Sequence, residues 1–424
     1  MSITTTAIIS MTGRVSMLGI SRWTGKGGSY RTIQRFFQTA IPWPLVFWQF
    51  FRKHNLDQDE SYFLVGDESV VSKSGKQTHG LDRFFSSLYG KPIPGVAFFS
   101  LALVGTKERR SYPVMVEQVI RTEEEKTAAK AKQQAKKTKA KTEKRQRGRP
   151  KGSKNKDKTQ VALTPELERI KAMVLKQLAL INGEIAINHL VLDGHFGNNN
   201  ALQMAGQCGL HLISKLRHDS ALYFPYAGSQ GKRKYGEKID YANIPAQYLK
   251  ESSLADDIRT DTYQATLLHK EFAQPLNGVI IVKTNLKTGK QAHVVLFSSD
   301  LDLTYEQIID FYSLRFQIEF NFRDAKQYWG LEDFMNVSPT AVTNAASLSL
   351  FMVNLTQPLL RDLRHDSPDA GILDLKTLYR GHKYVTETLK LLPEMPEPIL
   401  LDRIFASIAR IGRIHPCESP PNAA

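Results

Sequence analysis

The pattern of apolar and polar residues divides the first third of the chain into a helical part and a strand-forming part. Residues 1–58 hold short amphipathic runs separated by Gly- and Pro-containing segments, which predicts several short helices. Apolar runs at 62–66, 95–105 and 111–120 predict strands, and their close spacing favours antiparallel pairing. We therefore expect a helical segment followed by a sheet.

The middle of the chain alternates between the two patterns. Residues 164–183 form an amphipathic stretch with Thr164 as a plausible N-cap, which predicts a helix. A strand is predicted at 187–192, a helix over NALQMAGQCG, and a further strand at 210–217. Several strand-like runs separated by turn-rich segments then occupy 220–300.

The last part of the chain is predicted to be helical. One long helix, rich in Phe and Tyr, is expected over 304–328. Further helices are expected at about 338–364, 372–392 and 398–412. Both ends of the chain are thus predicted to be helical, with the strands between them.

The composition narrows the class of protein. A 42% hydrophobic and 23% charged chain resembles ordinary globular proteins, and no apolar run approaches the 18 residues of a membrane span. The N-terminus lacks the basic and long apolar regions of a signal peptide. Only two cysteines occur, Cys208 and Cys417, and their separation argues against a disulfide framework or a zinc finger. We expect a cytosolic location.

Most of the net charge of +15 lies in one segment. Residues 121–160 contain 16 Lys or Arg against 5 Asp or Glu, a net charge of +11, with almost no large apolar residues. Such a segment cannot bury a core, so we expect a flexible basic arm. The balance favours a polyanionic partner, although a protein that is merely basic is the alternative.

A short motif in this arm points to DNA. Arg147-Gly148-Arg149-Pro150, followed by Lys151, resembles an AT-hook, in which two Arg side chains enter the narrow minor groove of A·T tracts. A solvated charge run is the alternative for this motif. The basic helices of residues 1–58 leave two interpretations open, a DNA-binding head or a cap on the next domain.

Three carboxylates are candidates for a metal site. Asp67 and Asp193 each follow an apolar strand run, and Glu319 lies on the long predicted helix. Grouped carboxylates repel unless a cation neutralises them, and all-oxygen ligands suit Mg²⁺. Two such ions stabilise the attacking and leaving oxygens of a phosphoryl displacement. For a single Asp at a strand end, a turn or a cap is the commoner role. Asp67 is preferred over Glu68 because Asp67 ends the apolar run.

The helix over 304–328 carries an unusual polar stripe. Tyr312, Arg315, Glu319 and Lys326 lie at offsets of 0, 3, 7 and 14 residues. On a continuous helix these offsets fall within an arc of roughly 60°. The rest of the segment is bulky and apolar, and charged residues are seldom buried unless they are paired or bind something.

The spacing Tyr312-x2-Arg315-x3-Glu319-x6-Lys326 resembles the YREK signature of DDE transposases in the IS-four superfamily of bacterial insertion sequences. The layout is most similar to its IS-seven-hundred-one-type branch. VGDESVVSKSG around Asp67 and LVLDGHFGNN around Asp193 extend the resemblance, which covers about residues 10–365.

The resemblance implies an α/β fold, with an RNase H-like catalytic core in which helices flank a mixed sheet. The segment between Asp193 and Glu319, which lie 126 positions apart, would hold an inserted β-subdomain. The implied regions are a helical DNA-binding N-terminal region (1–58), the first part of the core (59–120), the basic arm (121–160), the core continued (161–218), the inserted β-subdomain (219–302), core helices with Glu319 (303–365) and a helical C-terminal region (366–424).

The resemblance also implies a function. The chain would be a cut-and-paste DNA transposase that pairs the terminal inverted repeats of its element as a homodimer, hydrolyses phosphodiesters and joins the ends to target DNA. Asp67, Asp193 and Glu319 would hold two Mg²⁺, with Mn²⁺ as a substitute. Arg315 and Lys326 would grip phosphates and Tyr312 a terminal phosphate, while an aromatic such as Tyr235 or Tyr241 would capture a flipped base. The location would be the bacterial cytoplasm, at the nucleoid.

Two other functions compete with this one. A domesticated, non-catalytic, sequence-specific DNA-binding protein on the same fold is disfavoured because the three acidic residues are present. A different RNase H-like nuclease, such as a junction resolvase, is disfavoured by the long strand-rich segment and the polar stripe. His79, His195 and His218 lack metal-ligand spacing and are expected to form local hydrogen bonds, while Lys73 and Lys76 are either DNA contacts or loop charges.

Deletion of residues 121–158 is expected to weaken binding to duplex DNA and to flatten its salt dependence. Each neutralised phosphate releases counterions, so the slope of log affinity against log salt should fall by about 0.9 for every phosphate that the arm no longer neutralises. The measurement is this slope for the full chain and for the deletion. An unchanged slope would mean that the arm does not bind DNA.

Overall fold

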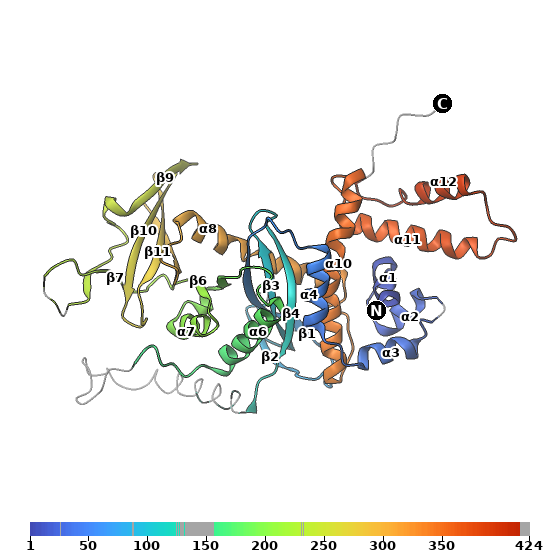
Figure 1. The fold of residues 1–424 in the computed structure, drawn as a ribbon, viewed down its shortest axis with the longest axis horizontal. Helices are drawn as coiled ribbons and strands as arrows, with labels where there is room; N and C mark the ends of the chain where they lie inside the picture. The colour runs from blue at the N-terminus through green and yellow to red at the C-terminus, as the bar shows by residue number, and fades with distance from the viewer. Residues whose placement is uncertain are drawn as a thin grey trace.

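The computed structural model describes residues 1–25, 27–86, 89–123, 125, 127, 131, 157–229, 231 and 233–415. Most of the basic arm, with Arg147, Arg149 and Lys151, lies outside these residues. Figure 1 shows an elongated arrangement, with a strand-rich region at one end and the N-terminal and C-terminal helices together at the other. None of the described helices combines the length and the apolar character needed to cross a membrane.

Twelve strands of the described chain join in one sheet. They are β1 (Tyr62–Ser72), β2 (Asp82–Ser86), β3 (Lys91–Gly105), β4 (Arg110–Val119), β5 (His189–Leu192), β6 (His211–Lys215), β7 (Leu222–Pro225), β8 (Tyr235–Lys238), β9 (Leu249–Ala255), β10 (Ile258–His269), β11 (Leu276–Asn285) and β12 (Gln291–Ser298). The predicted strands are confirmed, but β2 was not predicted and β1 continues six residues beyond the predicted end at residue 66.

The sheet is mixed, and β1 lies where its pairing changes direction. The order is β2-β3-β1-β5-β6-β12-β11-β10-β7-β8, with β4 beside β3 and β9 beside β10. β1 pairs antiparallel with β3 and parallel with β5, and β5 pairs parallel with β6. The strands of the segment 219–302 continue this same sheet, because β12 pairs antiparallel with β6.

The described helices surround the central strands. They are α1 (Ser2–Ser10), α2 (Met17–Trp23), α3 (Tyr30–Gln38), α4 (Trp43–His54), α6 (Pro165–Ile181), α7 (Asn199–Gln207), α8 (Tyr305–Leu314), α9 (Gln317–Tyr328), α10 (Pro339–Asp366), α11 (Ile372–Leu389) and α12 (Pro398–Ile408). Thr164 caps α6 as predicted, accepting a hydrogen bond from the Leu167 N–H at 3.3 Å. The prediction of a single helix over 304–328 is wrong, because the structure has two helices there.

Both faces of the central strands are buried, which explains their continuous apolar runs. Successive side chains of a strand point to opposite faces. Phe63 and Val65 of β1 belong to a core with α8, α9 and α10, whereas Tyr62 and Leu64 belong to a second core with α6 and α7. The sheet therefore separates two helical layers, and the parity of a residue decides which layer its side chain meets.

The N-terminal helices are fixed to α10 by one buried side chain. Asn344 is 1% exposed and donates hydrogen bonds to the carbonyl oxygens of Phe37 (2.7 Å) and Thr39 (2.8 Å). Its own Oδ1 accepts a hydrogen bond from Trp43 Nε1 at 2.7 Å. A buried amide with these partners satisfied fixes the segment between α3 and α4 in one arrangement. This packing attaches the N-terminal helices to α10.

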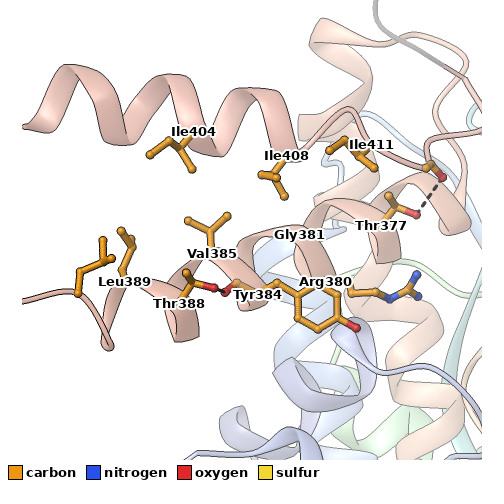
Figure 2. A pocket seen from close by; sticks show the side chains of 12 residues that line it. Thr377, Arg380, Gly381, Tyr384, Val385, Thr388, Leu389, Ile404, Ile408 and Ile411 are labelled. Carbon is orange, nitrogen blue, oxygen red and sulfur yellow. Dashed lines mark hydrogen bonds between the residues drawn. The ribbon is translucent and has the colours of Figure 1, made fainter. Parts of the chain in front are cut away.

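The C-terminal helices α11 and α12 enclose an apolar hollow of about 520 Å³ between their facing side chains. Figure 2 shows Ile404, Ile408 and Ile411 above Val385 and Leu389 across this hollow. Asp374 at the start of α11 fixes the chain that returns from α12. Its carboxylate accepts hydrogen bonds from the backbone N–H groups of Gly371 (2.9 Å), Ile414 (2.6 Å) and His415 (3.1 Å).

Replacement of Asp374 by Asn is expected to loosen this C-terminal region. Burial raises the pKa of the Asp374 carboxyl, but the hydrogen bonds from Gly371 and His415 outweigh it and the pKa is lowered to about 2 from an ordinary 3.8. A depressed pKa contributes stability above pH 3.8 that is lost as the pH falls through about 2. The contribution is roughly 2 kcal/mol at neutral pH.

Hydrogen exchange of α11 and α12 at pH 7 and at pH 3 measures this effect. We expect faster exchange in Asp374→Asn than in the wild type at pH 7 and a smaller difference at pH 3. Asp402→Asn, at an exposed position of α12, is the matched control. Equal exchange in the two variants at pH 7 would contradict the assignment.

Candidate functional site

The parallel pairing of β1 with β5 brings the two predicted aspartates together. Gly66 is the register partner of Leu192, so Asp67 and Asp193 are the next residues on neighbouring strands. The sequence had indicated that Asp67 ends its strand. This prediction is wrong, because β1 continues to Ser72 against β3. Asp67 is instead the first residue of β1 beyond the pairing with β5, which ends at Leu192.

The alternation of side chains places both carboxylates on the same face of the sheet. Asp67 has the parity of Phe63 and Val65, and Asp193 has the parity of Val191, all of which face the helical layer of α8–α10. Glu68 points the other way, into a small cavity that it shares with Glu166 and Arg169 of α6. This geometry supports the choice of Asp67 over Glu68.

The polar stripe lies across a break between α8 and α9. Arg315 and Phe316 form a turn between the helices, and the Glu319 N–H bonds to the Phe316 carbonyl at 3.0 Å. Such a bond spans three residues rather than four, which tightens the backbone locally. The four stripe residues therefore belong to two helices, with Tyr312 on α8 and Glu319 and Lys326 on α9.

Arg315 bridges two of the candidate carboxylates. Its Nη1 donates to Asp67 Oδ2 at 3.2 Å and its Nη2 donates to Glu319 Oε1 at 3.1 Å. The side chains are 14% exposed for Arg315, 23% for Asp67 and 41% for Glu319. Arg315 Nε is buried without a hydrogen-bond partner among the described residues. The guanidinium is thus held mainly by the two carboxylates.

The electrostatic environment disfavours a charge on Asp67. Burial is the largest influence and raises the pKa of the Asp67 carboxyl, Arg315 lowers it, and Asp193 and Glu319 raise it again, which brings the pKa to about 6. Asp193 and Glu319 thus both lie near enough to Asp67 for their charges to act on it. Burial therefore keeps the pKa of Asp67 above its ordinary value of 3.8 even with Arg315 beside it.

Lys326 and Tyr312 also face this region. Lys326 Nζ donates to the carbonyl oxygen of Val70 on β1 at 2.9 Å and lies 3.8 Å from Glu332. Burial lowers the pKa of Lys326. The guanidinium carbon of Arg315 lies 5.8 Å from the centre of the Tyr312 ring, and burial raises the pKa of Tyr312. The structure therefore brings the four stripe residues to the Asp67 side of β1 despite the helix break.

Lys73 is turned into the protein, which favours the structural alternative for this residue. Its Nζ donates to the carbonyl oxygens of Glu332 (3.2 Å) and Phe334 (2.8 Å) and lies 3.5 Å from the centre of the Phe334 ring. Burial lowers the pKa of Lys73 to about 8. Lys73 thus fastens the loop after α9 to the end of β1, a role that sequence reasoning missed.

The predicted histidines and aromatics have local contacts. His195 pairs with Glu166 at 3.5 Å, and the backbone carbonyl of His218 accepts a hydrogen bond from His293 at 2.9 Å. Tyr241 stacks on His293 with ring centres 3.9 Å apart and donates to the Ser220 carbonyl at 2.9 Å. The Tyr235 ring contacts the Tyr223 ring, with centres 5.5 Å apart.

The donor set fits a divalent cation, although its side chains are engaged with protein groups. In the described part of the chain, no group of three or more His, Cys, Asp and Glu residues is arranged to hold a metal ion. The two terminal nitrogens of Arg315 occupy one oxygen of Asp67 and one of Glu319. The oxygen donors and the raised pKa of Asp67 are nevertheless those of a site that an added positive charge would stabilise.

Comparison with protein-family models finds a match. A protein-family model described as DDE superfamily endonuclease matches residues 1–275. This range is more than half of the 424-residue chain, contains Asp67 and Asp193, and ends before Glu319. A search of curated proteins found no match for the chain.

Replacement of Arg315 by Gln is expected to destabilise the protein in a metal-free buffer by about 1–3 kcal/mol, because the carboxylates lose their positive partner. Mn²⁺ or Mg²⁺ should then raise the melting temperature of the variant more than that of the wild type, since a cation replaces the missing charge. The measurement is thermal unfolding in EDTA and in each metal.

Arg323→Gln is the control for this experiment. It makes the same charge change on α9 at an exposed residue that pairs with Asp324. If Arg315→Gln has the melting temperature of the wild type in EDTA, the bridge between Asp67 and Glu319 contributes nothing measurable.

Proposed function

The chain belongs to the DDE superfamily endonuclease family, and from this premise we propose that it is a metal-dependent DNA transposase. The proposed reaction is hydrolysis of phosphodiesters at the ends of an insertion sequence, followed by transfer of the ends into target DNA. The Tyr312, Arg315, Glu319 and Lys326 signature supports membership of the IS-four superfamily, and the layout supports its IS-seven-hundred-one-type branch.

One observation carries the proposal. Two aspartates stand side by side on parallel strands, and the same guanidinium that binds Asp67 also binds Glu319. Asp193 and Glu319 lie 126 and 252 residues after Asp67 in the sequence. Asp67 does not end β1, whereas Asp193 also caps the short helix Gly194–Phe196 by accepting a hydrogen bond from the His195 N–H at 3.0 Å. A fold that needed only stability would gain from an apolar residue at position 67.

The strand order supports an RNase H-like core. Three antiparallel neighbours, β4, β3 and β1, are followed by β5 and β6, which run parallel to β1. Ligands of open sheets with parallel strands bind beyond the carboxyl ends of those strands, and Asp193 lies at that end of β5. The later strands, β7 to β12, are the proposed inserted β-subdomain, attached to the core through β12 and β6.

Asp67, Asp193 and Glu319 are the proposed ligands of two Mg²⁺ ions, with Mn²⁺ as a substitute. Bound there, the ions would polarise the attacking water and stabilise the leaving oxygen of the phosphodiester. The chain's own contribution is orientation. The β1–β5 register fixes the two aspartates, and the packing of α9 on the sheet fixes Glu319.

The cations of the stripe are suited to the DNA backbone. Arg315 presents a planar fork that matches a phosphate as well as it matches Asp67 and Glu319. With a cation held by the carboxylates, this guanidinium would be free to bind a phosphate of the DNA strand. Lys326 and Tyr312 add a point charge and a hydroxyl at the same edge of β1. The proposed role of these three residues is to hold the scissile strand.

The proposed partners are duplex DNA with the terminal inverted repeats, target DNA and a second copy of the chain in the synaptic complex. Arg147, Arg149 and Lys151 are proposed to contact DNA from the basic arm, and the proposed location is the bacterial nucleoid. The competing function, a non-catalytic DNA-binding protein, would need no metal and would tolerate loss of the carboxylates.

Cleavage of DNA that carries the ends of the element tests the proposal. Asp67→Ala, Asp193→Ala and Glu319→Gln are each expected to lower metal-dependent cleavage by roughly a thousandfold or more, while DNA affinity stays close to that of the wild type. The measurement is the rate of strand nicking with Mg²⁺ or Mn²⁺, beside an anisotropy titration with the same DNA.

Glu68→Gln is the matched control, because it removes a neighbouring carboxylate that points to the opposite face of the sheet. Full cleavage by any one of the three variants would remove that residue from the proposed site. Specific binding by the wild type, with no cleavage in either metal, would favour the non-catalytic DNA-binding protein.

A further inference from the structure

A second polar hollow lies on the side of α9 away from the candidate carboxylates. It has a volume of about 340 Å³ and lies among β4, α9, α10 and the start of α11. Arg110 comes from β4, Asn321 and Tyr328 from α9, and Gln357 and Arg364 from α10. We call this hollow the arginine cavity.

Helix geometry separates the arginine cavity from the carboxylates. At 100° per residue, Asn321, Asp324 and Tyr328 lie about 140–200° around α9 from Glu319. These three residues line the arginine cavity, whereas Glu319 binds Arg315 on the β1 side. Most of the α9 residues that line the arginine cavity thus face away from Glu319, and Arg323, about 40° around the helix from Glu319, is the exception.

Two arginines in the cavity lack an acidic partner. Arg110 Nη1 donates to Gln357 Oε1, and Arg364 Nε donates to the carbonyl oxygen of Ala370 at 2.8 Å. In the described chain, neither Arg110 nor Arg364 forms an ion pair with a carboxylate. Arg323, which also lines the cavity, pairs with Asp324 at 2.9 Å. The cavity thus has an excess of positive charge.

The guanidinium groups of Arg110 and Arg364 are held near each other although they repel. Burial, and secondly the charge of Arg110, lower the pKa of Arg364. Both side chains are only partly exposed, and their neutral neighbours, Gln357 and the Ala370 carbonyl, fix their position without neutralising them. Like charges in a confined space destabilise a fold unless an anion joins them.

The chemistry of the lining selects the anion. A guanidinium fork matches the oxygens of a phosphate group, and two such groups can grip one phosphate from two sides. The cavity is larger than a phosphate alone, and its amides and the Tyr328 ring suit an attached sugar. A phosphodiester of a nucleic-acid strand meets both requirements.

We propose that Arg110 and Arg364 form a phosphate-binding site that holds the backbone of a DNA strand on the side of α9 opposite the candidate carboxylates. This assignment deepens the proposed function and rests on it for the source of the phosphate. The arginine cavity contributes affinity and positioning, and it has no part in the chemical step. The bound DNA is thus held on each side of the helix that carries Glu319.

The test compares Arg110→Gln, Arg364→Gln and the double variant with the wild type in binding to a duplex, by anisotropy over a range of salt. Each single variant is expected to weaken binding roughly tenfold, because it removes a charge-assisted hydrogen bond to phosphate. The slope of log affinity against log salt should fall by about 0.9 for each arginine removed.

Arg361→Gln is the matched control, since Arg361 lies one turn from Arg364 on α10 but faces the carbonyl of His54, outside the arginine cavity. Arg364→Lys keeps the charge and removes the fork, so its affinity should lie between those of wild type and Arg364→Gln. Melting temperatures at or above that of the wild type are expected for the Gln variants, because a repulsion is removed. These values also verify that the variants fold.

A second experiment distinguishes DNA from a free phosphate compound as the ligand. Inorganic phosphate and a deoxynucleoside 5′-monophosphate are added to wild type and double variant, and thermal unfolding is recorded. If they stabilise only the wild type while the double variant binds DNA as well as Arg361→Gln does, the DNA assignment is overturned in favour of a free phosphate. If neither experiment distinguishes the double variant from Arg361→Gln, the assignment of a phosphate site is overturned.

The two proposals fail in different ways. If the wild type binds no duplex under any salt condition, the proposed function fails. The experiment with free phosphate compounds still decides whether the arginine cavity is a phosphate site. If the wild type cleaves DNA and the double variant binds it with unchanged affinity and salt slope, the function stands and the assignment of DNA to the cavity is wrong.

Discussion

The candidate site depends on how three carboxylates are kept together. Asp67, Asp193 and Glu319 repel one another, and burial of Asp67 increases the cost of its charge. The protein meets this cost in two ways. Sheet register and helix packing hold the backbone positions, and Arg315 binds Asp67 and Glu319 with its two terminal nitrogens. Arg315 makes both hydrogen bonds from the break between α8 and α9 and so links β1 to α9.

The surroundings of this cluster are rigid because both faces of the central strands are covered. Phe63 of β1 stacks on Phe311 of α8 with ring centres 4.8 Å apart, which fixes α8 directly beside the carboxylates. On the far side of the same layer, Asn344 of α10 ties the N-terminal helices to the core through satisfied buried hydrogen bonds. A site whose acids must keep close positions despite repulsion needs such support, since local loosening would let them separate.

The sequence predicted the secondary structure well where the local pattern of apolar and polar residues determines it. Continuous apolar runs identified the buried strands, and Thr164 identified the start of α6. Asp67 and Asp193 were found because each follows such a run, but only the parallel β1–β5 register, a pairing between distant segments, makes them neighbours. The break at Arg315 escaped prediction because Arg315 and Phe316 keep helical dihedral angles and only the hydrogen-bond spacing changes. No sequence pattern identified Arg110 and Arg364, since their proximity depends on how α10 packs against β4.

The three sides of α9 contact three different parts of the protein. Ile318, Phe322 and Ala325 bury one side in the core, Glu319 and Lys326 face β1, and Asn321, Asp324 and Tyr328 face the arginine cavity. The three sides follow from the 100° step of the helix, which distributes every third or fourth residue to the same neighbour. Because the apolar side anchors α9, its two polar sides keep a fixed relation to each other. A phosphate bound in the arginine cavity is therefore held at a fixed position relative to Glu319, and the sheet that carries α9 sets the separation between the two sites.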